Sequence, residues 1–249
     1  MPVNDNNHRI SPIVITGGAQ RLGLAVARSL RAQQQSVVIT YRRERPLLEQ
    51  LRHEGIETIH ADFDDADGPE LLAAELGNRY RSLRALIHNA SQWLPEGGDD
   101  DPSQVMERML KVHVRAPYLL NLACGELLRR HGEQQGPADI IHMSDYVASA
   151  GSSKHIAYAA SKAALENLTL SFASKYAPLV KVNSIAPALL MFNPEDDESY
   201  RQKARSKSLL GIVPGAEEAV NAVCYLLQSR YLTGKTIALD GGRHLARAS

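Results

Sequence analysis

PIVITGGAQRLGLAVA (residues 12–27) joins a short apolar run to a stretch with helical periodicity through a turn that contains Gly17 and Gly18. The β-branched residues of the run are typical of a buried strand. Glycine lets the backbone turn tightly, and the N-terminus of the following helix offers free N–H groups that suit a phosphate. Such turns also connect strands to helices for purely structural reasons. The stretch therefore predicts a strand, a turn and a helix, and a phosphate site is one of two interpretations of the turn.

The same order of strand and helix repeats along the chain. Apolar runs that predict strands cover residues 12–18, 36–42, 57–63, 83–91, 138–145, 180–190 and 235–242. Amphipathic stretches that predict helices cover residues 21–34, 45–55, 68–80, 101–132, 155–177 and 217–229, and Gly132 is expected to end the longest of them before the fifth strand. This alternation favours an α/β fold, a three-layer doubly wound parallel sheet (Rossmann fold) of about seven strands. We expect a single domain, residues 1–249, with a substrate lid insertion around 191–212.

Composition and charge limit the classes of function. The chain has 249 residues, 44% of them hydrophobic, and its 28 Lys and Arg balance 28 Asp and Glu. This neutrality argues against nucleic acid or a membrane surface as the partner. No apolar run approaches the roughly 20 residues that cross a bilayer, and the polar residues 1–10 lack the apolar core of a signal peptide. Cys124 and Cys224 lack metal-ligand spacing and lie in apolar helical patterns, so we expect two buried, reduced thiols, no metal and a cytoplasmic protein.

The end of the second predicted strand indicates which dinucleotide the glycine turn would hold. The sequence ITYRRER (residues 39–45) lacks the acidic residue that binds the ribose in NAD enzymes, and has Tyr41, Arg42 and Arg43 instead. Guanidinium groups at this corner would pair with the 2′-phosphate of NADPH. A solvated charged loop is the alternative. Asp62, after the third strand, would meet the adenine edge or cap a helix.

Tyr158 and Lys162 lie four residues apart in a predicted helix and therefore share one of its faces. An ammonium group beside a phenol stabilises the phenolate and lowers the phenol pKa, so the tyrosine becomes a proton donor near neutral pH. Lys162 would also reach a nicotinamide ribose. Asp145 comes thirteen residues before the tyrosine, at the end of a predicted strand. A carboxylate there would couple its titration to both groups, and capping a surface loop is its alternative role.

Four stretches resemble the short-chain dehydrogenases/reductases, over almost the whole length of the chain. They are TGGAQRLG (16–23), HNAS (88–91), YAASK (158–162) and VNSIAPALL (182–190). At three positions the chain departs from the general pattern of this family. There it resembles the pteridine reductases, and most of all the bacterial dihydromonapterin reductases. Arg21 replaces the middle glycine of the phosphate turn, Asp145 replaces the catalytic serine, and the aromatic Trp93 follows the fourth strand.

The resemblance implies NADPH as the cofactor, a pterin as the substrate and a homotetramer as the assembly. The implied catalytic residues are Tyr158, Lys162 and Asp145. The implied cofactor contacts are Gly17, Arg21, Leu22, Tyr41, Arg42, Arg43, Asp62, Asn89, Ala90, Ser91, Lys162 and Ile185. The implied substrate contacts are Ser91, Trp93, Arg21, Asp145 and Tyr158. In pteridine reductases an aromatic side chain at the position of Trp93 stacks on the pterin, and packing under a loop is the alternative.

Two positions depart from the family without an obvious replacement. The family usually has an asparagine, which organises a water behind the lysine, where KVHVRAP (111–117) has His113. His113 would either keep that relay or be a core histidine bonded to the backbone. After the sixth strand the chain lacks the threonine that often contacts the carboxamide, so we expect only backbone contacts near Ile185 and Leu189. Tyr200, in the charged insertion, could belong to the lid.

The chemistry of Asp145 favours one class of substrate. A carboxylate would repel a carbonyl oxygen that gains negative charge, whereas a ring nitrogen of a pterin must gain a proton as the neighbouring carbon accepts hydride. Together with the resemblance to dihydromonapterin reductases, this implies NADPH-dependent reduction of 7,8-dihydromonapterin to 5,6,7,8-tetrahydromonapterin, with weak reduction of dihydrofolate. A reductase of ketones, sugars or acyl-carrier substrates is the alternative enzyme. A cofactor-sensing regulator without turnover is the alternative from another class of protein.

Overall fold

The computed structural model describes residues 11–97 and 100–246, so the N-terminal stretch expected to lack a signal peptide lies outside the described part. The strands are β1 Ile13–Ile15, β2 Val37–Tyr41, β3 Glu57–His60, β4 Ala85–His88, β5 Ala138–Met143, β6 Val180–Pro187 and β7 Thr236–Leu239. The α-helices are α1 Arg21–Ala32, α2 Leu47–His53, α3 Gly68–Arg79, α4 Pro102–Leu110, α5 Ala116–Ala123, α6 Gly125–Gln135, α7 Val147–Ala150, α8 Ile156–Tyr176, α9 Glu198–Arg205 and α10 Glu217–Gln228. A π-helical turn, η2 Lys111–Arg115, separates α4 from α5, and a short 3-10 turn, η3 Arg243–Leu245, follows β7.

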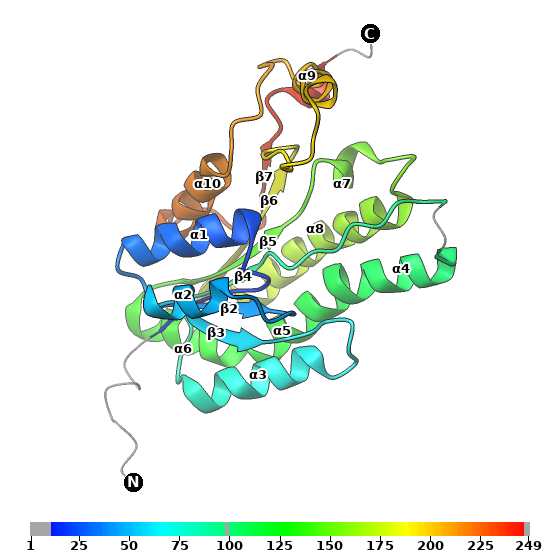
Figure 1. The fold of residues 1–249 in the computed structure, drawn as a ribbon. Helices are drawn as coiled ribbons and strands as arrows, with labels where there is room; N and C mark the ends of the chain where they lie inside the picture. Colours follow the sequence, from blue (N-terminus) through cyan, green and yellow to red (C-terminus); the bar gives the residue numbers. More distant parts are fainter. Residues whose placement is uncertain (1–10, 98–99, 247–249) are drawn as a thin grey trace.

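All seven strands of the described sheet are parallel and lie in the order β3-β2-β1-β4-β5-β6-β7. The chain builds outward from β1 to β3, then returns to place β4 on the other side of β1 (Figure 1). In such sheets a crevice opens at the carboxyl ends of the strands where the order reverses, here between β1 and β4. The predicted doubly wound parallel sheet is confirmed.

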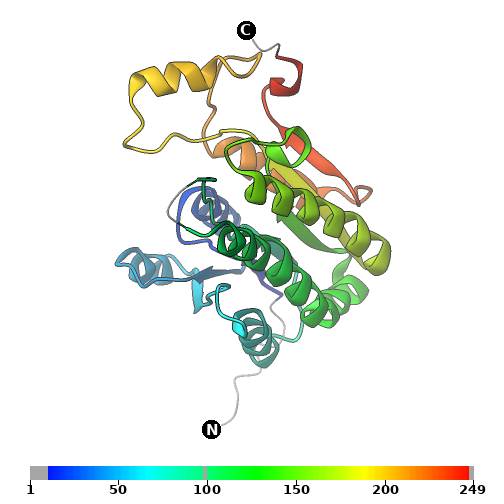
Figure 2. The ribbon, with the colours of Figure 1, turned by 90° about the vertical axis from the view of Figure 1, so that its right-hand side faces the viewer.

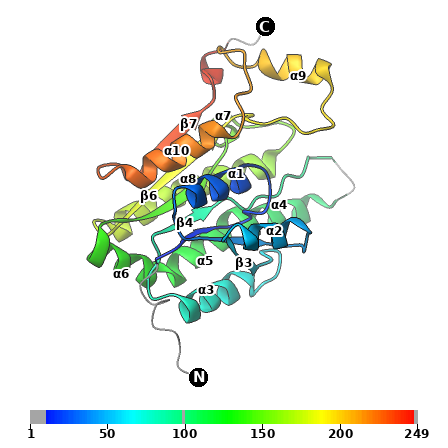
Figure 3. The same cartoon turned by 60° about the vertical axis from the view of Figure 1, so that its left-hand side comes forward.

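Alternating residues of the buried strands supply two separate cores. Ile13 and Ile15 of β1 pack with apolar residues of α1, α2 and α10, whereas Val14 packs with those of α3, α5 and α8. Figure 3 brings α1, α2 and α10 forward on their face of the sheet, and Figure 2 shows α4 and α8 on the other. This arrangement follows from the period of two in a strand, because both faces of a parallel sheet are covered and must be apolar.

The long helix predicted over residues 101–132 is interrupted and ends later than expected. The π-helical turn lies in its middle, and α6 continues through Gly132 to Gln135, where Gly136 with φ of 101° ends it. The prediction that Gly132 ends the helix is wrong. A Cβ at Gly132 would lie 2.3 Å from the carbonyl oxygen of Leu179, so this glycine serves close packing.

The charged insertion contains a helix that its sequence did not predict. α9 stands at the carboxyl end of the sheet, above β6 and β7 and near η3 (Figure 1). Asp197 caps it by accepting a hydrogen bond from the backbone N–H of Tyr200 at 2.7 Å. The two cysteines are free, Cys124 buried and Cys224 half-buried. In the described ranges, every helix is too short or too polar to traverse a lipid bilayer.

Candidate active site

A cleft of about 650 Å³ opens at the carboxyl ends of the strands, at the reversal between β1 and β4. It collects residues from strand ends that are far apart in the sequence. Of the predicted site residues it is lined by Gly17, Arg21, Leu22, Tyr41, Arg42, Arg43, Asp62, Asn89, Ala90, Ser91, Trp93, Asp145, Tyr158 and Lys162. The only predicted site residue that does not line it is Ile185.

Ile185 is fully buried in the core, and its carbonyl accepts a hydrogen bond from the backbone N–H of Ser144 at 2.7 Å. It therefore belongs to the interior of the β5–β6 pair. The chain reaches the cleft a few residues later, at Pro187, Ala188 and Leu189. The expectation of contacts near Leu189 agrees with this placement, and the expectation for Ile185 does not.

The glycine turn after β1 forms the floor of one half of the cleft. Gly17 has φ of +63°, and a Cβ there would lie 2.9 Å from the Cα of Ala90. Both the backbone conformation and the close packing therefore require glycine at this position. Asn89 donates hydrogen bonds from its amide to the carbonyls of Thr16 and Gly17, both at 3.0 Å. α1 begins after Gln20 without a side-chain cap and without an acidic residue in its first turn. These features suit the negatively charged phosphates of a dinucleotide.

Arg21 occupies a backbone conformation that favours glycine, with φ of 49°. This agrees with the resemblance, in which Arg21 stands where relatives have glycine. Its guanidinium donates to the side chain of Asn193 and, at 3.3 Å, to the carbonyl of Met191. Arg21 therefore ties the glycine turn to the segment that leads into α9. Tyr200 of α9 also lines the cleft, as expected for a residue of the insertion.

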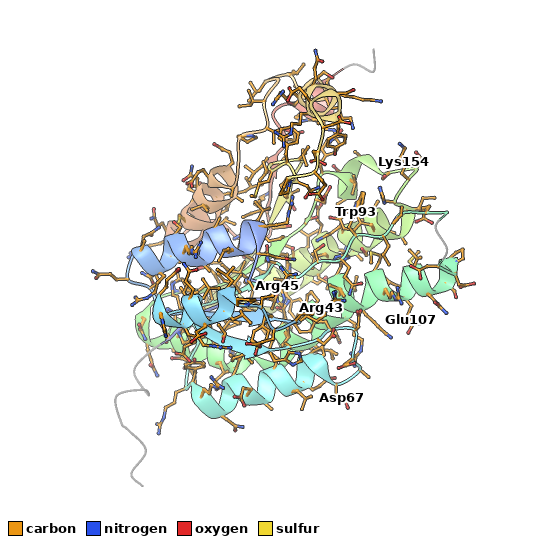
Figure 4. All side chains as sticks on the ribbon, in the orientation of Figure 1. Arg43, Arg45, Asp67, Trp93, Glu107 and Lys154 are labelled. Carbon is orange, nitrogen blue, oxygen red and sulfur yellow. The ribbon has the colours of Figure 1, made fainter. Side chains whose placement is uncertain are left out.

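Three arginines gather at the end of β2, one more than the sequence interpretation named. Arg45 lines the cleft and donates to the side chain of Gln20 at 2.8 Å, which places it at the start of α1. Arg42 forms an ion pair with Asp64 at 3.0 Å. Arg43 is exposed and, within the described ranges, has no hydrogen-bond or ion-pair partner (Figure 4). Arg43 and Arg45 are thus the guanidinium groups best placed for a phosphate.

Asp62 lies beside this corner and lines the cleft. Its carboxylate accepts a hydrogen bond from the backbone N–H of Asp64 at 3.0 Å, which closes a short turn after β3. Asp62 therefore faces the cleft, as a contact with the adenine edge requires, and it holds its own loop instead of capping a helix, since the N-cap residue of α3 is Asp67.

Tyr158 and Asp145 meet inside the cleft. The hydroxyl of Tyr158 donates to one carboxylate oxygen of Asp145 at 3.0 Å, and the other oxygen accepts from the backbone N–H of Val147 at 3.0 Å. Burial raises the pKa of Tyr158, and the negative charge of Asp145 and its hydrogen bond raise it further. The sequence predicted a lowered phenol pKa, and the structure contradicts this. The tyrosine is held neutral with its proton directed at the carboxylate.

Lys162 lies on the same face of α8 but does not bond the phenol. Its ammonium donates to the carbonyl of Met143 at 2.8 Å and lies 5.6 Å from the centre of the Tyr158 ring. Burial lowers the pKa of Lys162 to about 8, and the charge of Asp145 opposes this shift. The lysine is therefore charged at neutral pH and close to its titration range.

His113 is fully buried and connects the cleft to α8. Its ring lies edge-on to that of Tyr158, with centres 5.3 Å apart, and it bonds the hydroxyls of Ser91 at 2.9 Å and Ser161 at 2.8 Å. Burial, followed by the charge of Lys162, holds the pKa of His113 well below its usual range, so the ring is neutral. It is a core histidine, but its two shorter hydrogen bonds go to side chains and only a longer one, at 3.4 Å, comes from the backbone.

The hydrogen bonds around His113 assign its tautomer. Nε2 accepts, because the backbone N–H of Gln92 also points to it at 3.4 Å, so Nδ1 carries the proton and donates to Ser161. Ser161 in turn donates to the carbonyl of Tyr158 at 2.7 Å. The π-helical turn presents His113 at this point, and such turns are frequent at functional sites.

Trp93 stands at the mouth of the cleft. Its side chain is 62% exposed, which contradicts the alternative that it packs under a loop. Its ring stacks on that of His155, with centres 4.0 Å apart and planes tilted by 35°. His155 precedes α8 and was not identified from the sequence, since a lone histidine in a loop carries no signal. Trp93, exposed at the rim (Figure 4), and the half-buried His155 beneath it form a platform for a flat ring.

Comparisons with known proteins agree with this geometry. The sequence model of a family described as enoyl-(acyl carrier protein) reductase matches residues 17–244. The dihydromonapterin reductase of Enterobacter sp. (strain 638) is 53% identical over 234 residues, which cover 94% of this chain and 97% of the relative. The dihydromonapterin reductase of Escherichia coli (strain K12) is 50% identical over the same coverage.

Solved structures share the fold over nearly the whole chain. FolM alternative dihydrofolate reductase 1 from Brucella suis, in complex with NADP, has a TM-score of 0.83 and 26% identity, and covers 96% of this chain and 97% of its own. The RhlG/NADP complex of Pseudomonas aeruginosa has a TM-score of 0.85 at 24% identity and covers 97% of this chain and 100% of its own. From the match to residues 17–244 and the identity to full-length relatives, the chain belongs to the short-chain dehydrogenase/reductase family, in its group of dihydromonapterin reductases.

Proposed function

We propose that this protein is an NADPH-dependent pterin reductase that converts 7,8-dihydromonapterin into 5,6,7,8-tetrahydromonapterin. The observation that carries the proposal is the hydrogen bond from Tyr158 to Asp145 inside the cleft, at 3.0 Å. This bond places a negatively charged carboxylate beside the proton donor. In a ketone reductase, a carboxylate at this place would repel the substrate carbonyl oxygen as that oxygen gains negative charge. Relatives about half identical over nearly the full chain are dihydromonapterin reductases, which supports the same substrate.

The residues around the glycine turn fit NADP. Gly17 lets the turn pack closely against Ala90 at the cleft floor, the uncapped start of α1 offers N–H groups, and Arg43 and Arg45 would hold the 2′-phosphate. Bound there, NADPH supplies the hydride that carbon C6 of the pterin accepts. Two related structures contain NADP, which supports this cofactor.

The chain itself supplies the proton for the reaction. Hydride addition at C6 makes the neighbouring nitrogen N5 strongly basic, so N5 takes one proton as the C6–N5 double bond becomes single. Tyr158 holds that proton because its pKa is raised, and the charge on Lys162 stabilises the phenolate that remains. Asp145 is partly exposed in the cleft and returns a proton from solvent to the phenol.

Trp93 and Ser91 would orient the substrate. The exposed indole, supported from behind by His155, would stack on one face of the pterin and so fix its distance from the cofactor. Ser91 is held by His113 at the cleft wall and presents a hydroxyl to the ring edge. Dihydrofolate carries the same pterin ring, and structures of FolM are described as alternative dihydrofolate reductase, so weak dihydrofolate reduction is part of the proposal.

The experiment that tests this function follows NADPH oxidation with a panel of substrates. We expect rapid turnover with 7,8-dihydromonapterin, slower turnover with dihydrofolate, and little with ketones, sugars or acyl-carrier thioesters. Ketone reduction faster than dihydropterin reduction would contradict the assignment. Absence of NADPH consumption with every dihydropterin would instead support the non-catalytic alternative.

We infer a single-domain homotetramer that works in the cytoplasm. Apolar side chains on α4, α5 and α8 are exposed in the single chain, among them Met106, Leu110, Tyr118, Leu122 and Leu170. Such surface is typical of subunit contacts. The insertion around 191–212 would act as the substrate lid, because Tyr200 faces the cleft. The two free cysteines suit a reducing compartment. Sedimentation of the purified protein tests the assembly, and a monomer would contradict it.

A further inference from the structure

We propose that a cationic rim beside the cleft binds an anionic group, a phosphate or a carboxylate, on the side chain at C6 of the pterin. The rim consists of Lys154, Lys203, Lys207 and Arg243. This inference rests on the proposed function, since it concerns the part of the substrate that points away from the reacting ring.

Arg243 connects the rim to the catalytic groups. It lies in η3, lines the cleft and is half-buried. Its guanidinium lies over the ring of Tyr146, 4.7 Å from the ring centre, and Tyr146 directly follows the catalytic Asp145. The arginine is thus held in a fixed place at the substrate end of the cleft.

The two lysines of the insertion, one on α9 and one just after it, lie in the segment that packs against the loop of this arginine. Tyr200 lines the cleft, and Lys203 follows it by three residues, so both share one helix face. Lys207 comes just after the end of α9. The next residues pack against the loop that carries Arg243, because the backbone N–H of Leu210 donates to the carbonyl of Gly241 at 3.1 Å. The insertion is therefore anchored beside η3.

Lys154 approaches from the other wall of the cleft. It precedes His155, whose ring stacks on Trp93, and its carbonyl accepts from the backbone N–H of Glu96 at 2.9 Å. Figure 4 labels Lys154 and Trp93 beside α7, on the part of the molecule that lies below α9. Its charge also reaches the insertion: burial lowers the pKa of Lys207, and Arg243, Lys203 and Lys154 lower it further in that order.

The rim lacks compensating charge. In the part of the chain that the structure describes, none of its four cations has a carboxylate within ion-pair distance, although many other arginines do. The nearby acids are engaged elsewhere: Glu198 pairs with Arg205 at 2.8 Å, and Asp240 bonds His244 at 2.6 Å. Like charges without counterions repel each other, so their gathering in a chain of zero net charge indicates an anionic ligand.

The neutral hydroxyl groups of the monapterin side chain give no reason for four cations. A phosphate ester of the dihydropterin or the glutamate of dihydrofolate would supply the missing charge. Both present oxygen anions beyond the ring that Trp93 and Tyr158 would hold. The shared chemistry is an anionic tail, and the two sources are separated by experiment.

The test compares the wild type with K203Q/K207Q, because glutamine keeps the helix propensity of α9. The matched control is K175Q/K235Q, which removes two exposed lysines far from the cleft: Lys175 lies in the last turn of the helix that begins near Tyr158, and Lys235 precedes β7 at the opposite edge. kcat/KM is measured for neutral dihydromonapterin, its phosphate ester and dihydrofolate at low and high salt.

We expect K203Q/K207Q to lower kcat/KM for the anionic substrates about fivefold or more, with less than a twofold change for neutral dihydromonapterin and in the control. High salt should lower kcat/KM for the anionic substrates in the wild type and in the control, and less so in K203Q/K207Q. If kcat/KM of K203Q/K207Q falls only for the phosphate ester, the rim binds phosphate. If it falls only for dihydrofolate, the rim binds carboxylate, and if it falls for both, the rim binds either anion. Equal kcat/KM values of the wild type and K203Q/K207Q for both anionic substrates would overturn the proposal that the rim binds an anion. Lack of turnover with neutral dihydromonapterin would instead refute the proposed function.

Discussion

Asp145→Asn isolates the charge of the carboxylate from its geometry. The asparagine oxygen still accepts the N–H of Val147 at the start of α7, and its amide still contacts the hydroxyl of Tyr158. What disappears is the negative charge. A hydrogen bond to a charged group contributes about 1.5–3 kcal/mol and a neutral one about 0.5–1.5 kcal/mol. The variant should therefore lose about 1–1.5 kcal/mol, which corresponds to a decrease in kcat/KM for dihydromonapterin of roughly 5- to 12-fold.

The pH profile of the same variant reports the charge directly. Lys162 has a pKa of about 8, lowered by burial and raised in part by Asp145. Activity requires the charged lysine, so it falls as the pH rises through this value. Without the carboxylate the pKa of Lys162 drops further, and the alkaline limb of kcat/KM should move to lower pH. A limb at the same pH as in the wild type would mean that Asp145 does not act on the lysine.

The assay follows NADPH oxidation from pH 5.5 to 9.5, with thermal unfolding as the check on folding. Asp145→Ser provides the contrasting variant, because serine is the residue that the family more often has here. It should gain ketone reduction while losing dihydropterin reduction. Equal dihydropterin kinetics, an unmoved alkaline limb and no gain with ketones, in variants with wild-type unfolding temperatures, would together refute a catalytic carboxylate.

Three further outcomes follow from the geometry. Tyr158→Phe should lower kcat by roughly 10²- to 10⁴-fold and leave NADPH binding, measured by fluorescence titration, nearly intact; high residual turnover would exclude the phenol as proton donor. Arg43→Gln should raise the KM for NADPH by roughly 5- to 30-fold, from about 1–2 kcal/mol of lost charged hydrogen bonding, with little effect on the KM for NADH; an equal rise for both would contradict a 2′-phosphate contact. Trp93→Ala should raise the KM for dihydromonapterin roughly 2- to 12-fold, from about 0.5–1.5 kcal/mol of stacking, and an unchanged KM would show that the indole does not bind the ring.

The strands and the glycine turn were predictable because their signals are local. The apolar run before Gly17 and its counterparts along the chain give the sheet, and the i and i+4 spacing of Tyr158 and Lys162 gives their shared face. The break in the long central helix was not predictable, since its residues favour an α-helix and only the packing around His113 distinguishes the π-helical turn. The role of Gly132 was predicted wrongly for a similar reason. A side chain at this position would collide with the backbone of Leu179, which is distant in the sequence.

The electrostatics of the site depend on distances that spacing alone does not contain. The sequence places Lys162 beside Tyr158 on a helix, yet the ammonium turns to the carbonyl of Met143 and the phenol turns to Asp145. The sign of the pKa change at Tyr158 is thereby reversed. Arg45 and His155 were missed because their importance arises from Gln20 and Trp93, which approach them only in the folded chain.

The raised pKa of Tyr158 also explains why this site suits a pterin better than a ketone. A phenol with a raised pKa, bonded to a carboxylate, is a weak acid, so it gives up its proton only to a group that becomes strongly basic during the reaction. A carbonyl oxygen that gains negative charge would lie near a second negative charge, and its transition state would be destabilised. A pterin nitrogen takes up a proton as C6 accepts hydride, and the N–H donors of the ring can bond to Asp145 instead of being repelled by it. The same carboxylate that weakens the acid therefore selects the substrate, while the charged Lys162 stabilises the phenolate that remains.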